Sequence, residues 1–307
     1  MKDRSTADTD EWPDATRITK GGARKAPPIV AVDVAGQSHQ GLVRSKNEDH
    51  FVVVRLGRFL ERLQSNLPEG DSPSRFQEIT YGFGVADGIG GSAGGEEASR
   101  IALDTLNNLI LDVPDWIFRP DDEILTREIV RRASERYEKI KEKLKEHAQE
   151  EPRLHGYGTT MTVAWNLGKN LFIGHIGDSR AYLHRQHRMC QLTRDHTMAQ
   201  ALADHGQVSQ AEVAKHRLRH VLTRSLGDRV MEVKPDIQQV VLDAGDRLLL
   251  CSDGLTDMVS DSGISAILDQ GESAEKTCQA LVDAALASGG KDNVTVIVAR
   301  YDTPKKS

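Results

Sequence analysis

Apolar and polar residues alternate along much of the chain, and a period of two residues predicts β-strands. The first two such segments are IVAVDVAG, residues 29–36, and HFVVVRL, residues 50–56. From residue 158 onward, short strands are expected to follow one another, and DAGD (243–246) is expected to be a hairpin turn between two of them. The strands expected in this part are 159–167, 170–178, 180–185, 188–193, 236–242, 247–253 and 292–301.

Helical spacing of apolar residues occurs in four other segments. Residues 96–111 predict a helix with acidic residues in its first turn, and residues 262–270 and 272–288 predict a helix pair. Because strands come in hairpins and helices are set apart in pairs, we expect one α+β domain with antiparallel sheets. Residues 121–151 predict a long amphipathic helix, with a buried stripe of Leu125, Ile129, Ala133, Tyr137, Ile140 and Leu144.

Two segments show neither the two-residue period of a strand nor the spacing of a helix. Residues 1–28 are polar and end in Pro-Pro, which predicts a flexible tail before a domain that spans residues 29–302. The stretch NLPEGDSPSRFQEI, residues 66–79, is rich in turn-forming residues. It predicts a surface insertion at about residues 57–78.

Composition narrows the class of protein. The net charge is −6, with 40 Lys and Arg against 46 Asp and Glu, which argues against a nucleic-acid-binding face. The three cysteines form no CxxC pair, a usage typical of reduced thiols in a cytosol. No apolar run approaches membrane-spanning length, and the first 24 residues do not resemble a signal peptide. We therefore expect a cytoplasmic protein that binds neither nucleic acid nor membrane.

The stretch YGFGVADGIGGSAGGEEASR, residues 81–100, is the first sign of chemistry. An apolar strand ends on Asp87, and glycines follow. Gly88, Gly90 and Ala93 fit the G-x-G-x-x-A pattern of a nucleotide cradle. However, Asp87 would repel a pyrophosphate, and no second parallel strand with a terminal acid follows at the expected distance. A metal site therefore explains the stretch better.

Other acids lie at the ends of apolar runs. They are Asp253, Asp292, Asp178 and the pair Glu48-Asp49. Carboxylates that converge without partners raise one another's pKa, and a divalent cation removes that cost. Oxygen ligands suit Mg²⁺ or Mn²⁺. For each acid taken alone, capping of a turn is an equally good explanation. The full set favours metal binding.

Eight motifs follow one another in a characteristic order. They are VRSKNED (43–49), VADGIGG (85–91), GTTMT (158–162), GHIGDSRAYL (174–183), LTRDHT (192–197), VLTRSLGD (221–228), LLLCSDGLTD (248–257) and GGKDNVTVIV (289–298). With these motifs the chain resembles the metal-dependent Ser/Thr protein phosphatases, the PPM or type 2C family, and above all their bacterial members, over residues 29–301. The resemblance implies a four-layer α-β-β-α sandwich of two antiparallel sheets, each flanked by a helix pair.

The same resemblance implies roles for the acids. Asp87 matches the carboxylate that bridges two metal ions, with the Gly88 carbonyl completing one site. Asp253 and Asp292 match ligands of the other ion. Asp178 matches the ligand of a third, weaker ion, which is expected to share Asp253. The expected cofactors are therefore Mn²⁺ or Mg²⁺, two at the core and one beside it.

Three further residues take roles from the resemblance. Glu48 matches a position that holds a metal ion through water, and Asp49 one that orients the ligands. Arg44 matches the arginine that binds the substrate phosphate, which suits its planar fork. The implied chemistry is direct attack on phosphorus by a metal-bridged hydroxide, with Asp87, Asp253 and Glu48 as the catalytic set. Ile89 stands where many eukaryotic members carry a histidine, which leaves the proton donor to a metal-bound water.

The predicted function is hydrolysis of phosphoserine and phosphothreonine in proteins that are targets of a Ser/Thr kinase, by a monomeric enzyme. The alternative is a catalytically inactive phosphoprotein-binding module on the same fold. Residues 198–220 match the flap beside the active site of bacterial relatives, and their apolar positions predict two short helices. His50, His175 and His196 lie near the motifs and are expected to be structural.

Overall fold

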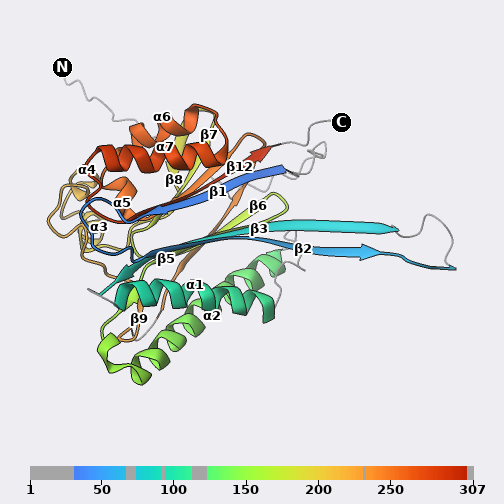
Figure 1. Ribbon diagram of the computed structural model, residues 1–307, viewed down its shortest axis with the longest axis horizontal. Coiled ribbons are helices and arrows are strands. Elements are labelled where there is room, and N and C mark those ends of the chain that lie inside the picture. Colours follow the sequence, from blue (N-terminus) through green and yellow to red (C-terminus); the bar gives the residue numbers. More distant parts are fainter. Residues whose placement is uncertain (1–30, 67–73, 91–93, 113–122, 231–232, 303–307) are drawn as a thin grey trace, which may run out of the picture.

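The fold is a sandwich of four layers. The computed structural model describes residues 31–66, 74–90, 94–112, 123–230 and 233–302. Two antiparallel sheets lie face to face, and helix pairs cover their outer faces (Figure 1). This arrangement confirms the predicted α+β class and its α-β-β-α layers. The predicted tail, residues 1–28, lies outside the described residues.

One sheet has five strands, and all its pairings are antiparallel. Its central strands are buried on both faces, because alternate residues of β12 face the helices and the other sheet. Val294, Val296 and Val298 pack against the helices, whereas Ile297 and Ala299 pack between the sheets. In order across the sheet, the strands are β1 (Ala31–His39), β12 (Val294–Asp302), β11 (Arg247–Cys251), β7 (Arg180–Arg185) and β8 (Arg188–Gln191).

The other sheet has seven strands and is also antiparallel. Strand β2 pairs with β3 over its whole length, so the two form a long hairpin that projects from the body of the molecule (Figure 1). The strands are β10 (Asp236–Val241), β6 (Asn170–Ile176), β5 (Met161–Leu167), β3 (Arg75–Ile89), β4 (Gly158–Thr159), β9 (Leu226–Gly227) and β2 (Asp49–Glu61).

Helices α1 (Gly94–Asp112) and α2 (Glu123–Glu150) pack on the seven-stranded sheet, and α6 (Asp261–Asp269) and α7 (Ala274–Ala287) pack on the five-stranded one. The predicted stripe of α2 is confirmed from Ile129 to Leu144, while the side chain of Leu125 lies outside the described part. The short elements are α3 (Met198–Asp204), α4 (Gln210–Val213), α5 (Asp253–Thr256) and the 3₁₀ turn η3 (Pro152–Leu154).

Part of the predicted insertion at about residues 57–78 consists of paired strands: residues 57–61 and 75–79 form the outer ends of β2 and β3, since backbone pairing continues from Gly57–Ile79 to Glu61–Arg75. One sequence prediction about a turn is wrong. The DAGD segment does turn, but it does not close a hairpin. Strand β10 before it pairs with β6, and strand β11 after it pairs with β12 and β7. The segment therefore crosses from one sheet to the other.

Candidate active site

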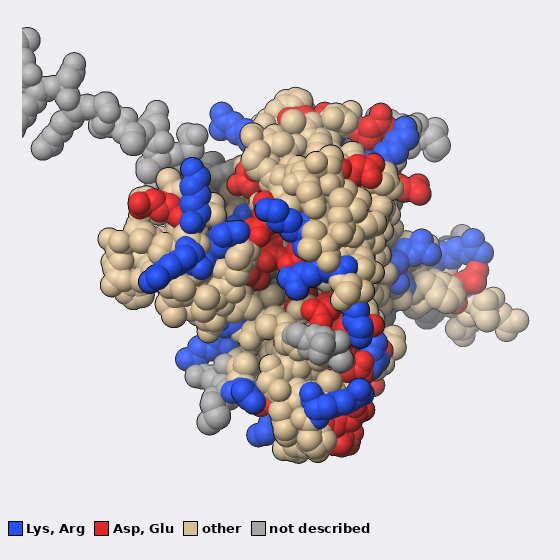
Figure 2. All heavy atoms as spheres, turned by 60° about the vertical axis from the view of Figure 1, so that its left-hand side comes forward, with Lys and Arg blue, Asp and Glu red and all other residues tan. Residues whose placement is uncertain are grey.

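A polar pocket opens at one end of the sandwich. Its volume is about 320 Å³, and five of the predicted acids line it together with Arg44 and Lys46. Figure 2 shows acidic side chains gathered in a hollow of this face, with Lys and Arg around it. The strand ends and loops of both sheets meet here, which explains how acids far apart in the sequence converge. The five acids are Glu48, Asp87, Asp178, Asp253 and Asp292.

Asp87 lies near the end of β3, and the threonines of the GTTMT motif hold its backbone. The Thr159 hydroxyl and the Thr160 N–H donate to the Asp87 carbonyl oxygen at 2.8 and 2.9 Å. The Asp87 N–H in turn donates to Thr160 Oγ1 at 3.1 Å. With its carbonyl and N–H both held by neighbouring groups, the residue has little freedom to move. Its carboxylate therefore has a defined place in the pocket.

Asp49 is the direct neighbour of Asp87 across the β2–β3 ladder. It is buried, and the Ser252 hydroxyl donates to its Oδ2 at 2.7 Å. Its other oxygen, Oδ1, is buried without a hydrogen-bond partner among the described residues. Burial, opposed by hydrogen bonds, raises the pKa of Asp49 to about 7. An orphaned carboxylate oxygen of this kind is what a cation or its water would satisfy.

Asn293 joins the loop before β2 to the start of β12. Its side-chain NH₂ group donates to the carbonyl oxygens of Gln40 at 2.7 Å and Lys46 at 2.8 Å. Its side-chain oxygen accepts the Glu48 N–H at 2.8 Å. These three bonds place Glu48 and Arg44 beside Asp292. The Arg44 guanidinium lies 2.5 Å from the Asp292 carboxylate at the rim of the pocket.

Two glycines of the motifs are explained by close backbone approach. A Cβ atom on Gly88 would lie 2.2 Å from the carbonyl oxygen of Gly95, at the start of α1. On Gly254, it would lie 1.9 Å from the carbonyl oxygen of Asn293. Neither contact is possible for another residue without moving the backbone. The structure thus gives both glycines a packing role in bringing the site's segments together.

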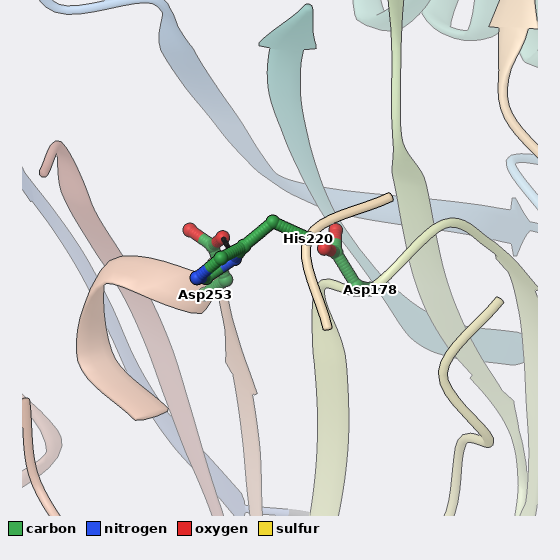
Figure 3. Close-up of side chains that lie close together, drawn as sticks. All are labelled: Asp178, His220 and Asp253. Carbon is green, nitrogen blue, oxygen red and sulfur yellow. Dashed lines mark ion pairs between the residues drawn. The ribbon is translucent and has the colours of Figure 1, made fainter. Parts of the chain in front are cut away.

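The apolar pattern predicted that Asp253 and Asp178 are the last residues of strands, but neither residue ends a strand. Asp253 is the first residue of α5, and Asp178 lies two residues after β6. With His220 from the end of the flap, their ligand atoms lie within 4.8 Å of one another (Figure 3). Sequence analysis did not single out His220. Its proximity to two acids depends on the path of the flap, and no local pattern signals it.

The electrostatics of the pocket favour a bound cation. Burial is the largest cause that raises the pKa of Asp87, and the charges of Asp49, Asp253, Asp178 and Asp292 raise it further. Burial and the charge of Asp253 likewise raise the pKa of Asp178. Positive charge among these groups would allow all of them to ionise. The donor set, carboxylate oxygens and a backbone carbonyl, fits Mg²⁺ or Mn²⁺.

The three histidines expected to be structural lie outside the lining of this pocket. His50 bonds to the Ser99 hydroxyl at 2.9 Å, and His175 to the Thr162 hydroxyl at 2.8 Å. His196 lies 3.0 Å from Asp236. The flap itself contains α3 and α4, as its apolar positions predicted.

Comparison with known proteins identifies the family. Residues 80–294 match the family model described as Protein phosphatase 2C. The chain is 35% identical over 268 residues to the serine/threonine protein phosphatase PstP of Mycobacterium tuberculosis, a match that covers 86% of this chain but 44% of PstP. The chain thus spans less than half the length of this relative. Over 222 residues it is 31% identical to the serine/threonine phosphatase stp of Listeria monocytogenes, covering 72% of this chain and 85% of stp.

The fold is also that of a solved phosphatase domain. The crystal structure of the catalytic domain of PstP, in complex with two manganese ions, superposes with a TM-score of 0.67. The match has 32% sequence identity and covers 88% of this chain and 98% of the PstP domain. The family model, the curated relatives and the solved structure agree. The chain belongs to the protein phosphatase 2C family.

Proposed function

We propose that this protein hydrolyses phosphoserine and phosphothreonine in protein substrates. The observation that carries the proposal is the pocket itself. It brings Asp87, Asp253, Asp292 and Glu48 together from separate segments and places Arg44 at the rim. The relatives named as serine/threonine phosphatases support this substrate class.

The acids would hold two divalent cations, Mn²⁺ or Mg²⁺. Asp87 would lie between both ions, the Gly88 carbonyl would serve one of them, and Asp253 and Asp292 the other. When bound, such ions activate water for attack on phosphorus and neutralise the phosphate oxygens. The two manganese ions in the PstP crystal structure support the number of ions and the choice of Mn²⁺. Asp178, which shares the pocket with Asp253, would hold a third and weaker ion.

Arg44 would bind the phosphate group of the substrate. Its side chain is about half exposed and faces the pocket from the rim. The guanidinium presents two N–H groups in one plane, which matches two phosphate oxygens. Its contact with Asp292 keeps the positive charge at the mouth of the pocket until a phosphate arrives. Lys46 adds a second positive charge to the same rim.

Glu48 and Asp49 would position water in the pocket. Glu48 lines it and its backbone is held by Asn293, so its carboxylate can accept a hydrogen bond from a water at a fixed place. Asp49 is buried beneath the pocket lining, where the Ser252 hydroxyl donates a hydrogen bond to it, and from there it would orient the ligands. None of the three cysteines lines the pocket. We infer that phosphate passes directly to water, without a cysteine nucleophile.

An inactive phosphoprotein-binding module would need the arginine but not the full set of acids. Every predicted ligand is present here and five of the six acids line one pocket. The complete set of acids favours an active phosphatase over an inactive binding module.

The setting of the reaction is part of the proposal. We place the protein in the cytoplasm, as a monomer that reverses the action of a Ser/Thr kinase. The three cysteines are free thiols, which suits a reducing compartment. Among the described residues, no helix is long and apolar enough to cross a membrane.

Release of phosphate from a phosphothreonine peptide tests the proposal. We expect turnover with Mn²⁺ or Mg²⁺ and its loss in excess chelator, because the acids repel one another without cations. Asp243→Asn, a change at an exposed acid far from the pocket, serves as the matched control and should be as active as the wild type. Full turnover in chelator would overturn the metal assignment. Metal-loaded protein that binds the peptide without releasing phosphate would instead support the binding module.

A further inference from the structure

A second polar pocket lies far from the candidate active site. Its volume is about 300 Å³, and none of its lining residues lines the active-site pocket. Strand β7 starts two residues after Asp178 and ends at the second pocket, which places it roughly 20 Å along the strand from that acid. The turn between β7 and β8, the DAGD segment and the end of α6 surround it. Helix α6 lies over β7 and β8 here (Figure 1).

Two histidines meet one carboxylate oxygen in the second pocket. His184 Nε2 lies 3.0 Å from Asp269 Oδ1, and His187 Nδ1 lies 2.8 Å from the same atom. His184 is on β7 and His187 is in the turn that follows, whereas Asp269 is the last residue of α6. The three side chains therefore come from a sheet and from the helix layer that covers it.

The His184 side chain is buried, and its Nε2 atom lacks a hydrogen bond. The side chain is 5% exposed, and Nε2 has no hydrogen-bond partner among the described residues, although Asp269 is near. Burial is the largest cause that lowers the pKa of His184, so the imidazole is neutral at neutral pH and retains a lone pair. A buried polar atom without a partner destabilises the fold, and a bound ion would remove that cost.

The carboxylate of Asp269 stands at the negative end of a helix. The last turn of α6 contains no basic residue. Because the helix dipole places partial negative charge at this end, an ionised acid there is unfavourable unless a cation is near. The His187 hydrogen bond is the largest cause that lowers the pKa of Asp269, so this side chain is ionised at neutral pH. The helix end therefore favours a bound cation.

The turn that carries His187 has an unusual backbone. Arg185 pairs with Arg188, so Gln186 and His187 form the turn between them, and their φ angles are 51° and 64°. Turns of this kind usually carry Asn and Gly, since most other side chains adopt positive φ at a cost. In this conformation the His187 ring lies beside Asp269.

We propose that His184, His187 and Asp269 bind a Zn²⁺ ion. His184 Nε2, His187 Nδ1 and Asp269 Oδ1 are the protein ligands, and water takes the fourth position of a tetrahedral site. The three ligand atoms do not all lie within 4.8 Å of one another, so the His187 ring turns to complete the site. Its side chain is 86% exposed, which leaves room for that movement. Two imidazole ligands favour Zn²⁺ over Mg²⁺, whereas the acids of the active-site pocket suit Mg²⁺ or Mn²⁺.

A bound Zn²⁺ would tie the helix layer to the sheet. Ile264 and Leu268 of α6 pack in one apolar cluster with Tyr182 of β7, and the ion would add a polar link at the edge of that cluster. The site uses no residue of the active-site pocket. The proposal therefore stands or falls independently of the proposed function.

The competing explanation is a cluster of hydrogen bonds that holds the turn against α6 without a metal. Arg185 and Arg247 also line the second pocket and would oppose a cation. Arg185 is already paired with Asp246 at 2.6 Å, which leaves Arg247 as the main opposing charge. The two explanations differ in one observable, because only a metal site places a nitrogen of each histidine ring on an ion.

Calorimetric titration of the full-length, Mn²⁺-saturated protein with Zn²⁺ tests the proposal. We expect one Zn²⁺ site in the wild type that His187→Asn weakens on the order of 10–100-fold. Asparagine tolerates positive φ, so this variant should fold, which circular dichroism checks. His205→Asn replaces an exposed histidine of the flap and should retain the site.

Exchange of Zn²⁺ for Mn²⁺ in the active-site pocket would appear equally in all three proteins. The difference between the wild type and His187→Asn therefore isolates the second pocket. Equal Zn²⁺ titrations of these two proteins would overturn the proposal.

Nitrogen NMR of the histidine rings gives an independent readout. At saturating Zn²⁺ we expect His184 to carry its proton on Nδ1 and His187 on Nε2, because the other nitrogen of each ring binds the ion. Both ligating nitrogens should shift when Zn²⁺ is added and return when it is removed with chelator. Shifts confined to other histidines, or no shift at all, would show that the cluster is held by hydrogen bonds alone.

Discussion

Arg44 and Asp87 line the same pocket but differ in their surroundings. Asp87 is held by Thr159 and Thr160 and surrounded by negative charge, whereas Arg44 is about half exposed and contacts Asp292 at the rim. In the proposed function Asp87 would bind cations, and Arg44 would bind an anion. Substitution should therefore separate metal binding from substrate binding.

We expect Asp87→Asn to lose roughly 10²–10³-fold in turnover, because it would remove a charged ligand from the proposed two-ion centre. Arg44→Ala should lose about 10–100-fold in kcat/KM, mainly through KM, because it removes charged hydrogen bonds to the phosphate. Calorimetric titration with Mn²⁺ measures metal binding and distinguishes the two variants, since only Asp87→Asn should bind Mn²⁺ weakly. Normal metal binding in Asp87→Asn together with weak binding in Arg44→Ala would mean that the two roles are assigned wrongly.

Asp178→Asn distinguishes a turn cap from a metal ligand. Asparagine caps a turn about as well as aspartate, so a structural role predicts little change. As the ligand of a third ion, Asp178 should matter for positioning the water that protonates the leaving oxygen, a task that Ile89 cannot perform. We expect a folded variant with two tight Mn²⁺ ions and about 10–100-fold lower turnover on a phosphopeptide. Wild-type turnover at saturating Mn²⁺ would leave Asp178 as a cap.

At the scale of elements, the pocket depends on contacts between loops. The loop before β2, the start of β12 and the first turn of α5 meet through Asn293 and Gly254. Ser252 adds a second link, since it bonds to Asp49 and accepts the Thr295 N–H at 3.0 Å. These polar contacts align segments that the hydrophobic core only brings near.

Asn293→Ala should loosen this alignment. It removes three hydrogen bonds and leaves the Gln40 and Lys46 carbonyls and the Glu48 N–H without this partner, which should cost about 1–3 kcal/mol of unfolding free energy. Urea unfolding measures the loss. Asn108→Ala, on the exposed face of α1, is the matched control and should change stability by less than about 0.5 kcal/mol. Equal stability of the two variants would show that Asn293 does not hold the loops.

At the scale of the whole molecule, apolar side chains pack between the four layers of the sandwich and stabilise the fold. A titratable side chain, that of His175, is buried among them. His175 on β6 is 1% exposed, bonds to Thr162, and has its ring centroid 4.7 Å from that of His196. Asp236 on β10 lies opposite His175 in the sheet. Burial is the largest cause that lowers the pKa of His175 from 6.5 to about 3.

This depressed pKa predicts acid sensitivity. Between pH 6.5 and about 3, the unfolded chain binds a proton at His175 that the folded protein does not, so stability is present above pH 6.5 and falls as the pH falls. Urea unfolding at pH 7, 6 and 5 should show this decline in the wild type and a smaller one in His175→Gln. The difference between the two proteins isolates His175 from other groups. Parallel curves would mean that His175 titrates normally in the fold.

Much of the architecture is readable from the sequence, because it depends on local burial. Strand β7 was predicted at its observed bounds, Arg180–Arg185, and the buried stripe of α2 was predicted from Ile129 to Leu144. A strand or helix that packs against a core must show the period of its own geometry. The acids of the motifs were also visible, since each follows or precedes an apolar run.

Which segments meet could not be predicted from local sequence patterns. Nothing in DAGD reveals that β10 and β11 belong to different sheets, and residues 57–61 and 75–79 pair as strands although they fall in or beside the predicted insertion. Likewise, His220 reaches Asp253 and Asp178 only because the flap folds back to a β-bridge between Thr197 and Leu222. The periodicity of apolar residues indicates which residues of a segment are buried, but not which other segment they pack against. Contacts between residues distant in sequence depend on chain topology. The elements and the acids could therefore be recognised from local sequence patterns, whereas their combination into one site follows from the fold.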